Sequence, residues 1–273
     1  MDRCVNVMSF NMKRNYLSVG KNRWENRAAL VVRVILDNQP DILGTQELTS
    51  ASLGDLQRLL PDYAYVGLGR GGGEAGEYSA IFYRRSKFRL VQHKTFWLSP
   101  TPDRPSRGWM ALFPRICTTC TLAFRDGGEL LQVYNTHLDH ISYFARLGGL
   151  KLILRQMLEH QQQYGEVPTI LMGDFNATPG SRTLRHWQQY MENDPAFEGL
   201  ENSYNLLLST PQDLGRSYHG FRGAVEGHPI DYIFTSKSLR PQAVEIHRAA
   251  YSSRFPSDHY PVVAQLELLA TPN

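Results

Sequence analysis

The sequence predicts an α/β fold in which two packed β-sheets are flanked by helices. Three observations support this prediction. Short apolar stretches typical of strands occur from one end of the chain to the other, and several are followed by segments with apolar residues at helical spacing. Turn signals such as Asp126-Gly127-Gly128 separate other strands and indicate hairpins. We expect one domain over residues 1–273, because α/β proteins of this length often fold around one continuous core.

The first part of the chain is expected to alternate strands and helices. A strand at residues 5–10 precedes a helix that ends before Pro40. A strand at residues 42–47 then precedes a helix that starts at Ser52 and ends before Pro61. Both helices are predicted from apolar residues at helical spacing, which are Ala28, Val31, Val32 and Ile35 in the first and Leu53, Leu56, Leu59 and Leu60 in the second.

The middle of the chain is predicted to form antiparallel strands and then a long helix. The helix is expected at residues 144–163, where apolar residues recur on one face. Cys117 and Cys120 lie within one strand, where an offset of three places their side chains on opposite faces, so we expect packed thiols rather than a zinc site. The four strands of this part are expected at residues 79–84, 88–97, 116–124 and 130–136.

The last part begins with a continuously apolar strand at residues 169–172, a pattern typical of a strand buried on both faces. Ser181 can cap a short helix that contains Leu184 and Trp187. Three further strands are expected at residues 230–235, 243–247 and 262–268.

Composition and charge limit the classes of function. The chain has 29 Lys and Arg against 26 Asp and Glu, and a net charge of +3 is too small to argue for nucleic acid by itself. No apolar run reaches the roughly 18 residues of a membrane span, and no leader pattern precedes the first strand. With only three cysteines, we expect a cytoplasmic protein, without a membrane span or an evident obligate protein partner.

Polar side chains at the ends of apolar strands are the feature of the sequence that most needs a functional explanation. A rigid scaffold presents catalytic groups at such positions, whereas a single polar residue at a strand end is usually a solvated surface group. Five places in this chain have the pattern: Asn11, Glu47, His137, Gly173-Asp174-Phe175-Asn176, and Asp231 together with Ser257-Asp258-His259.

The run from Gly173 to Asn176 suits chemistry on a phosphoryl group. In extended backbone Asp174 and Asn176 point to the same side, while Phe175 points back to the core. A carboxylate can orient or deprotonate water, and a neighbouring carboxamide can donate hydrogen bonds to a developing negative oxygen. Gly173 would leave room for a ligand or metal to approach the backbone.

Two further sets complete the pattern. Asn11, Glu47 and Asp258 offer oxygen ligands, which favour hard cations such as Mg²⁺ or Mn²⁺ over zinc. Asp231 and His259 have the residue types of a carboxylate and imidazole pair, in which the acid fixes the tautomer and supports the protonated ring.

Taken together, these motifs resemble those of the endonuclease/exonuclease/phosphatase superfamily, in the same order along the chain. The superfamily contains DNase-I-like nucleases, abasic-site endonucleases, deadenylases, inositol-phosphate phosphatases and sphingomyelinases. The resemblance covers nearly the whole chain and rests on Ser9-Phe10-Asn11, Gln46-Glu47, Asn135-Thr136-His137-Leu138, Gly173-Asp174-Phe175-Asn176, Ile230-Asp231-Tyr232 and Ser257-Asp258-His259-Tyr260-Pro261.

The resemblance implies a four-layer α/β sandwich, with two packed mixed or antiparallel sheets flanked by helices and the site at one edge of the sheets. It also implies a divalent metal, Mg²⁺ or Mn²⁺, with Glu47 as the principal ligand, assisted by Asn11 and Asp258.

The same resemblance implies roles for five catalytic residues. Asp174 and Asn176 would position the attacking water and the phosphate. His259, supported by Asp231, would act as general base or phosphate ligand, and His137 would contact the scissile phosphate.

Substrate contacts are less constrained by the sequence. Arg115 begins a strand where related nucleases place a phosphate-binding arginine; a solvated arginine is the alternative. Asp139 and His140 belong either to a substrate subsite or to the start of the following helix. Aromatic residues in or beside the loops could stack on bases or sugars, or else be buried anchors: Trp97, Trp109, Phe113, Tyr218, His219 and Phe221.

One apparent motif is rejected. Residues 71–76 form a glycine-rich loop that matches a dinucleotide-binding pattern, but a strand rather than a helix is expected after it, so a mobile rim loop is the better interpretation.

The predicted function is therefore metal-dependent hydrolysis of a phosphate ester, with a phosphodiesterase or nuclease ahead of an enzyme acting on a sugar, inositol or lipid phosphate. A non-catalytic binding protein on the same scaffold is the third alternative, although no motif position has been replaced.

Overall fold

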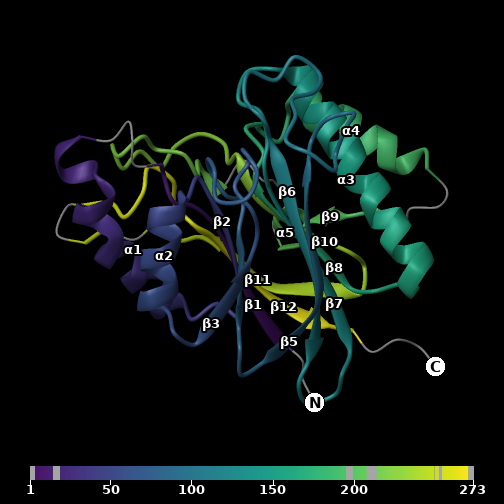
Figure 1. Cartoon of the computed structure of the whole chain (residues 1–273), viewed down its shortest axis with the longest axis horizontal. Helices are drawn as coiled ribbons and strands as arrows, with labels where there is room; N and C mark the ends of the chain where they lie inside the picture. Colours follow the sequence, from purple (N-terminus) through teal and green to yellow (C-terminus); the bar gives the residue numbers. More distant parts are fainter. Residues whose placement is uncertain are drawn as a thin grey trace.

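A computed structural model describes residues 4–14, 19–194, 199–207, 214–248, 250–251 and 254–269 of the chain. Within these ranges two six-stranded sheets pack face to face. Helices α1 (Trp24–Asn38) and α2 (Ser50–Leu59) lie on one side of the pair, and α3 (Tyr143–Tyr164) and α4 (Arg182–Glu192) on the opposite side (Figure 1). The predicted four-layer α/β sandwich is confirmed.

The first sheet combines strands from both ends of the described chain. Strand β1 is parallel to β2 and antiparallel to β12, so residues near position 5 pair with residues near position 266. In spatial order its strands are β11 (Leu239–Ile246), β12 (Val262–Leu268), β1 (Cys4–Asn11), β2 (Ile42–Gln46), β4 (Ile81–Arg84) and β3 (Tyr63–Val66).

The second sheet is built from the middle of the chain. Strand β7 is parallel to β8, and β8 is antiparallel to β10. In spatial order its strands are β5 (Phe88–Trp97), β6 (Ile116–Phe124), β7 (Leu130–His137), β8 (Thr169–Asp174), β10 (Asp231–Thr235) and β9 (Glu201–Asn202). The short helices η1 (Gly20–Asn22) and α5 (Ser203–Leu207) complete the described elements.

The stretch predicted as one run of antiparallel strands is divided between the two sheets. Strand β4 belongs to the first sheet and β5 to the second, so the chain changes sheets between Arg84 and Phe88. The pattern of apolar residues could not show that β4 and β5 belong to different sheets. Strands of both sheets bury the same kinds of apolar side chain, so their sequence patterns are alike.

Successive side chains of β1 point to opposite faces of the first sheet and so pack into two different cores. Met8 and Phe10 pack against the core under α1 and α2, whereas Val5 and Val7 belong to the core shared with the second sheet. Asn11 shares the parity of Val5 and Val7, so its side chain is directed toward the second sheet.

Helix ends agree with the predictions except at α2. The Ser181 hydroxyl accepts the backbone N–H of Leu184 at 3.4 Å, as expected for the cap of α4. Helix α2 starts at Ser50 rather than at Ser52, with Thr49 as its cap. Ser52 is the third residue of the helix, and its hydroxyl accepts the backbone N–H of Thr49 at 2.8 Å. The expected start was wrong because a serine inside the first turn can complete a cap as well as begin one.

A buried amide bridge joins the two sheets beneath the strand ends. The Asn135 side chain on β7 donates to the backbone carbonyls of Thr45 and Ala80, each at 2.9 Å, and accepts from Gln46 Nε2 at 2.8 Å. Buried polar groups must find partners, so these bonds favour one relative position of the sheets.

Cys117 and Cys120 are free, and their side chains are buried in the core. Burial raises the pKa of both thiols, which confirms that they are packed as neutral groups. Across the described ranges, every helix is too short or too polar to cross a membrane.

Candidate functional site

Strand register brings three predicted site residues side by side on the second sheet. His137 at the end of β7 pairs with Asp174 at the end of β8, and Asp174 pairs with Asp231 at the start of β10. Because β7 and β8 are parallel and β10 is antiparallel, these three positions meet at one edge of the sheet. His137 Nε2 lies 3.5 Å from Asp174 Oδ2.

The first sheet brings Asn11 and Glu47 to the same place. Asn11 Nδ2 donates to Asp174 Oδ2 at 3.0 Å and to Glu47 Oε1 at 3.2 Å, so one carboxamide connects the sheets through two carboxylates. Glu47 directly follows β2 and has a left-handed backbone with φ 64°. This conformation is uncommon for a residue with a side chain, and such residues gather at functional sites.

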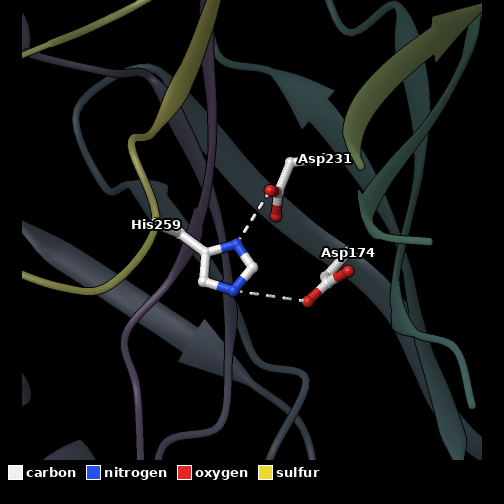
Figure 2. Close-up of side chains that lie close together, drawn as sticks. All are labelled: Asp174, Asp231 and His259. Carbon is white, nitrogen blue, oxygen red and sulfur yellow. Dashed lines mark hydrogen bonds and ion pairs between the residues drawn. The ribbon is translucent and has the colours of Figure 1, made fainter. Parts of the chain in front are cut away.

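The segment before β12 contains the last two predicted site residues, Asp258 and His259. The Ser257 hydroxyl donates to the backbone carbonyl of Asn11 at 2.6 Å and fixes this segment against β1. His259 then lies between two acids: its Nδ1 is 2.9 Å from Asp231 Oδ2, and its Nε2 is 3.8 Å from Asp174 Oδ2. Figure 2 shows the ring bridging the two carboxyl groups.

Burial and charge determine the protonation of this chain of groups. Burial acts to lower the pKa of His259, but the Asp231 carboxylate outweighs it and raises the pKa to about 10. Burial, followed by the charge of Asp231, raises the pKa of Asp174 to about 7. Burial and the charge of Arg115 instead hold the pKa of His137 well below its usual range. These interactions thus favour the protonated form of His259 and the neutral form of His137, and they raise the pKa of Asp174 above its ordinary value.

Two expectations about the end of β8 and the turn that follows it need correction. Gly173 leaves no room for a ligand, because a Cβ on it would lie 1.9 Å from the carbonyl oxygen of Thr136 on the neighbouring strand. Asn176 is not in extended backbone but has a φ of 48°. Its backbone N–H donates to Asp174 Oδ1 at 2.9 Å, so the turn places both residues in the cleft, while Phe175 is fully buried as expected.

Arg115 is only 6% exposed, which excludes the alternative of a solvated arginine. Its side chain hydrogen-bonds His140 Nδ1 at 3.0 Å, and its Nε lies 3.7 Å from Asp139 Oδ2. Asp139 Oδ1 also accepts the backbone N–H groups of Ile141 and Ser142, so Asp139 both shapes the turn before α3 and holds Arg115. His140 lines the cleft beside it.

All nine predicted site residues contact one another or line a common cleft. The members on its wall are Glu47, Arg115, His137, Asp174, Asn176, Asp258 and His259, while Asn11 and Asp231 lie behind them in contact with Asp174 and His259.

Sequence reasoning missed a group of charged residues in the same cleft. Arg14 and Arg70 both form ion pairs with the buried Glu77, at 3.1 and 2.9 Å. Lys13 Nζ lies 2.9 Å from Asp258 Oδ2. Arg70 directly precedes the glycine-rich loop at residues 71–76. This loop was interpreted as a mobile rim, but backbone hydrogen bonds such as Gly71 N to Ala75 O close it on itself. Only Lys13 and Arg14, which lie two and three residues after Asn11, carried a usable signal in the sequence.

Two groups of side chains could hold a metal ion. Ligand atoms of Asp174, Asp231 and His259 lie within 4.8 Å of one another. In that group, however, Asp231 Oδ2 already lies 2.9 Å from His259 Nδ1, so a metal there would have to break this contact or displace a proton from the ring.

Asn11, Glu47 and Asp258 fit a hard cation better. All three present oxygen atoms, and a positive charge already lies against this set, because Lys13 contacts Asp258. Burial acts to raise the pKa of Asp258, but the charges of His259 and Lys13 outweigh it and lower the pKa, so the carboxylate is available as a ligand.

The aromatic residues proposed for stacking divide into three sets. Trp97 and His219 are buried, as expected of anchors. Trp109 and Phe221 are half-buried. Phe113 and Tyr218 are 38% and 47% exposed and line the cleft, so these two are available to a substrate.

Comparisons with known proteins agree with this fold. Fly Nocturnin (Drosophila melanogaster) is 28% identical over 90% of the chain, although the match spans only 42% of the fly protein. A crystal structure of an endonuclease/exonuclease/phosphatase family protein from Bacteroides thetaiotaomicron superposes with a TM-score of 0.87 at 32% identity and covers 98% of this chain and 99% of that one. A mannosyl-6-phosphatase of the same organism superposes with a TM-score of 0.85, also at 32% identity, over 96% of this chain and 99% of that one.

A sequence profile described as the Endonuclease/Exonuclease/phosphatase family matches residues 8–259, a span that runs from β1 to His259 and so includes every residue of the candidate site. The chain therefore belongs to the endonuclease/exonuclease/phosphatase family.

Proposed function

We propose that this protein is a divalent-metal-dependent hydrolase that cleaves a phosphate ester by attack of water. The observation that supports the proposal is that three kinds of group line one cleft. They are oxygen ligands such as Glu47, the Asp174 carboxyl group with its raised pKa, and the protonated His259. Asn11 connects the first two of these directly, because its carboxamide bonds both Glu47 and Asp174. Buried acids and histidines whose pKa values are raised by their surroundings, as those of Asp174 and His259 are, gather at catalytic sites more often than at binding surfaces.

Glu47, Asn11 and Asp258 are the proposed ligands of Mg²⁺ or Mn²⁺. The metal would supply positive charge to the phosphate oxygens and to the leaving group. Glu47 is well placed for this role because its other oxygen accepts the backbone N–H of Arg14 at 2.9 Å, which fixes the orientation of the carboxylate.

Asp174 is the proposed group that positions the water and takes its proton. Its pKa near 7 matches the requirement for a general base at neutral pH. Asn176 and Asn11 hold the two oxygens of this carboxyl group through hydrogen bonds of 2.9 and 3.0 Å, so the base is oriented before a substrate arrives.

His259 is proposed to donate a hydrogen bond to a phosphate oxygen rather than to act as a base. Asp231 keeps the ring protonated and fixes its orientation. Neutral His137 and the guanidinium of Arg115 complete the proposed phosphate site, and Arg115 can bind two oxygens at once.

Two substrate classes fit the cleft. A phosphodiester of a nucleic acid is favoured by the exposed rings of Phe113 and Tyr218, which could stack on bases beside the phosphate. A phosphomonoester of a sugar is favoured by the likeness to a mannosyl-6-phosphatase over nearly the whole chain.

Hydrolysis assays on a panel of substrates test both substrate classes. The panel contains DNA and RNA oligonucleotides, a nitrophenyl phosphodiester, a nitrophenyl phosphomonoester, mannose 6-phosphate and inositol phosphates, each with Mg²⁺, Mn²⁺ or a chelator. We expect metal-dependent turnover of at least one class, and loss of turnover in Glu47→Ala and Asp174→Ala with the circular dichroism spectrum retained. Failure to hydrolyse any phosphate ester with either metal would refute the proposal.

A further inference from the structure

Lys13 occupies a cation position among the proposed metal ligands. Its Nζ lies 2.9 Å from Asp258 Oδ2, and its backbone N–H donates to Asn11 Oδ1 at 3.0 Å. The next backbone N–H, that of Arg14, donates to Glu47 Oε2 at 2.9 Å. Each of the three proposed ligands is therefore bonded to the Lys13-Arg14 segment.

The Lys13 ammonium compensates negative charge that would otherwise be concentrated at the site. The Asp258 side chain is 3% exposed, whereas that of Lys13 is 29% exposed, so the lysine reaches inward from the solvent side. The Asp258 carboxylate and the half-buried Glu47 carboxylate line the same cleft and repel each other, and the ammonium group at Asp258 relieves that repulsion. A lysine is suited to a reversible contact, because its flexible stem can carry the charge back to water.

The backbone of Lys13 indicates that this contact is maintained against strain. Its φ of 53° lies in the left-handed region, which costs a residue with a side chain about 1 kcal/mol or more. Such conformations persist where surrounding bonds compensate them, here the bonds to Asn11 and Asp258.

We propose that Lys13 is an internal counter-ion that holds a cation position at Asp258, in the cleft that Glu47 also lines, until a divalent metal binds these two carboxylates, and that the metal must displace it. This inference rests on the proposed function, because it takes those carboxylates as metal ligands. An ammonium group and a divalent ion cannot contact the same oxygens together. Lys13 therefore lowers the apparent metal affinity by the fraction of molecules in which it occupies the site.

Calorimetric titration of Mg²⁺ and of Mn²⁺ into chelator-stripped protein tests the displacement directly. We expect Lys13→Met to bind metal about fivefold more tightly than the unmodified chain, which corresponds to removing an ion pair worth about 1 kcal/mol. Lys13→Arg keeps the charge and should stay within about twofold of the unmodified chain. Arg70→Met is the matched control, since Arg70 is a cation of the same cleft that pairs with Glu77 instead of a proposed ligand.

Thermal unfolding gives a second measurement that needs no substrate. In chelator, Lys13→Met should melt about 3 °C below the unmodified chain, because the carboxylates have lost their counter-ion. With saturating metal the difference should vanish or reverse, because metal binding stabilises the folded state. Lys13→Gln, which keeps a polar side chain, should behave in the same way and shows whether the methionine itself affects folding.

Three results would overturn the inference. The first is metal affinity in Lys13→Met equal to or weaker than that of the unmodified chain. The second is an equal gain in Arg70→Met, which would indicate a general effect of charge in the cleft. The third is failure of the unmodified chain to bind either metal, which together with absent hydrolysis would refute the proposed function as well. Metal binding and turnover in the unmodified chain with no effect of Lys13→Met would refute the counter-ion alone.

Discussion

Replacing Asp231 by asparagine isolates the charge of the buried acid that supports His259. The substitution keeps the size of the side chain and an oxygen that can accept the His259 Nδ1–H, which lies 2.9 Å from Asp231 Oδ2. Two unit charges about 4 Å apart interact by about 4 kcal/mol at an effective dielectric constant of about 20. The retained neutral hydrogen bond offsets about 1 kcal/mol of this. A loss of about 3 kcal/mol in transition-state binding corresponds to about a 100-fold decrease in kcat/KM.

The assay is the rate of nitrophenolate release from a phosphodiester at saturating Mg²⁺, measured for Asp231→Asn and for the unmodified chain between pH 6 and about 9. Without Asp231 the pKa of His259 falls from about 10 toward its ordinary value, so the ring loses its proton as pH rises through neutrality. The activity ratio between the two proteins should therefore widen with pH. A variant that folds normally and retains more than a third of kcat/KM at every pH would show that His259 does not act as a cation.

Three further predictions concern single residues. Arg115→Lys should lower kcat/KM about tenfold or more in the same assay while the protein stays folded, because lysine cannot bind two phosphate oxygens in one plane. Gly173→Ala should cost at least about 3 kcal/mol of unfolding free energy in urea, because the added Cβ would meet the Thr136 carbonyl and the φ of 143° disfavours a side chain. Burial lowers the pKa of His219 to about 4, below its ordinary value of about 6.5. The contribution of this residue to stability is therefore complete above pH 6.5 and is lost as pH falls toward 4. His219→Gln should remove about 2 kcal/mol of this pH dependence of the unfolding free energy, measured by urea unfolding at several pH values.

The site residues that lie at strand ends could be predicted from the sequence, because the end of a strand is marked by the few residues around it. Asn11, His137 and Asp174 each follow an apolar stretch, and parallel pairing brings such ends to one edge. The same reasoning identified Asp231 and His259 as a possible pair but could not show contact. The two residues are 28 positions apart, and the chain between them includes segments without regular periodicity.

The missed residues depend on packing between loops and strands. Glu77 and Arg70 meet because the loop between β3 and β4 folds back on itself, and no periodic pattern encodes that turn. Gly173 was assigned to a ligand because glycine permits close approach in general, whereas the approaching atom is the carbonyl of a neighbouring strand. A glycine in a sequence indicates that another atom approaches its backbone closely, but it does not identify that atom.

The pairing of β1 with β12 affects the timing of folding during synthesis. The second sheet is contiguous in the chain from Phe88 to Thr235, so a ribosome can release all of it before β12 has emerged. The first sheet must wait, because the two neighbours of β1 are β2 and a strand translated more than 200 residues later. Nascent chains halted before β12 should therefore contain His137, Asp174 and Asp231 in near-final positions yet lack enzymatic activity, which would begin only when the last strand is inserted beside β1.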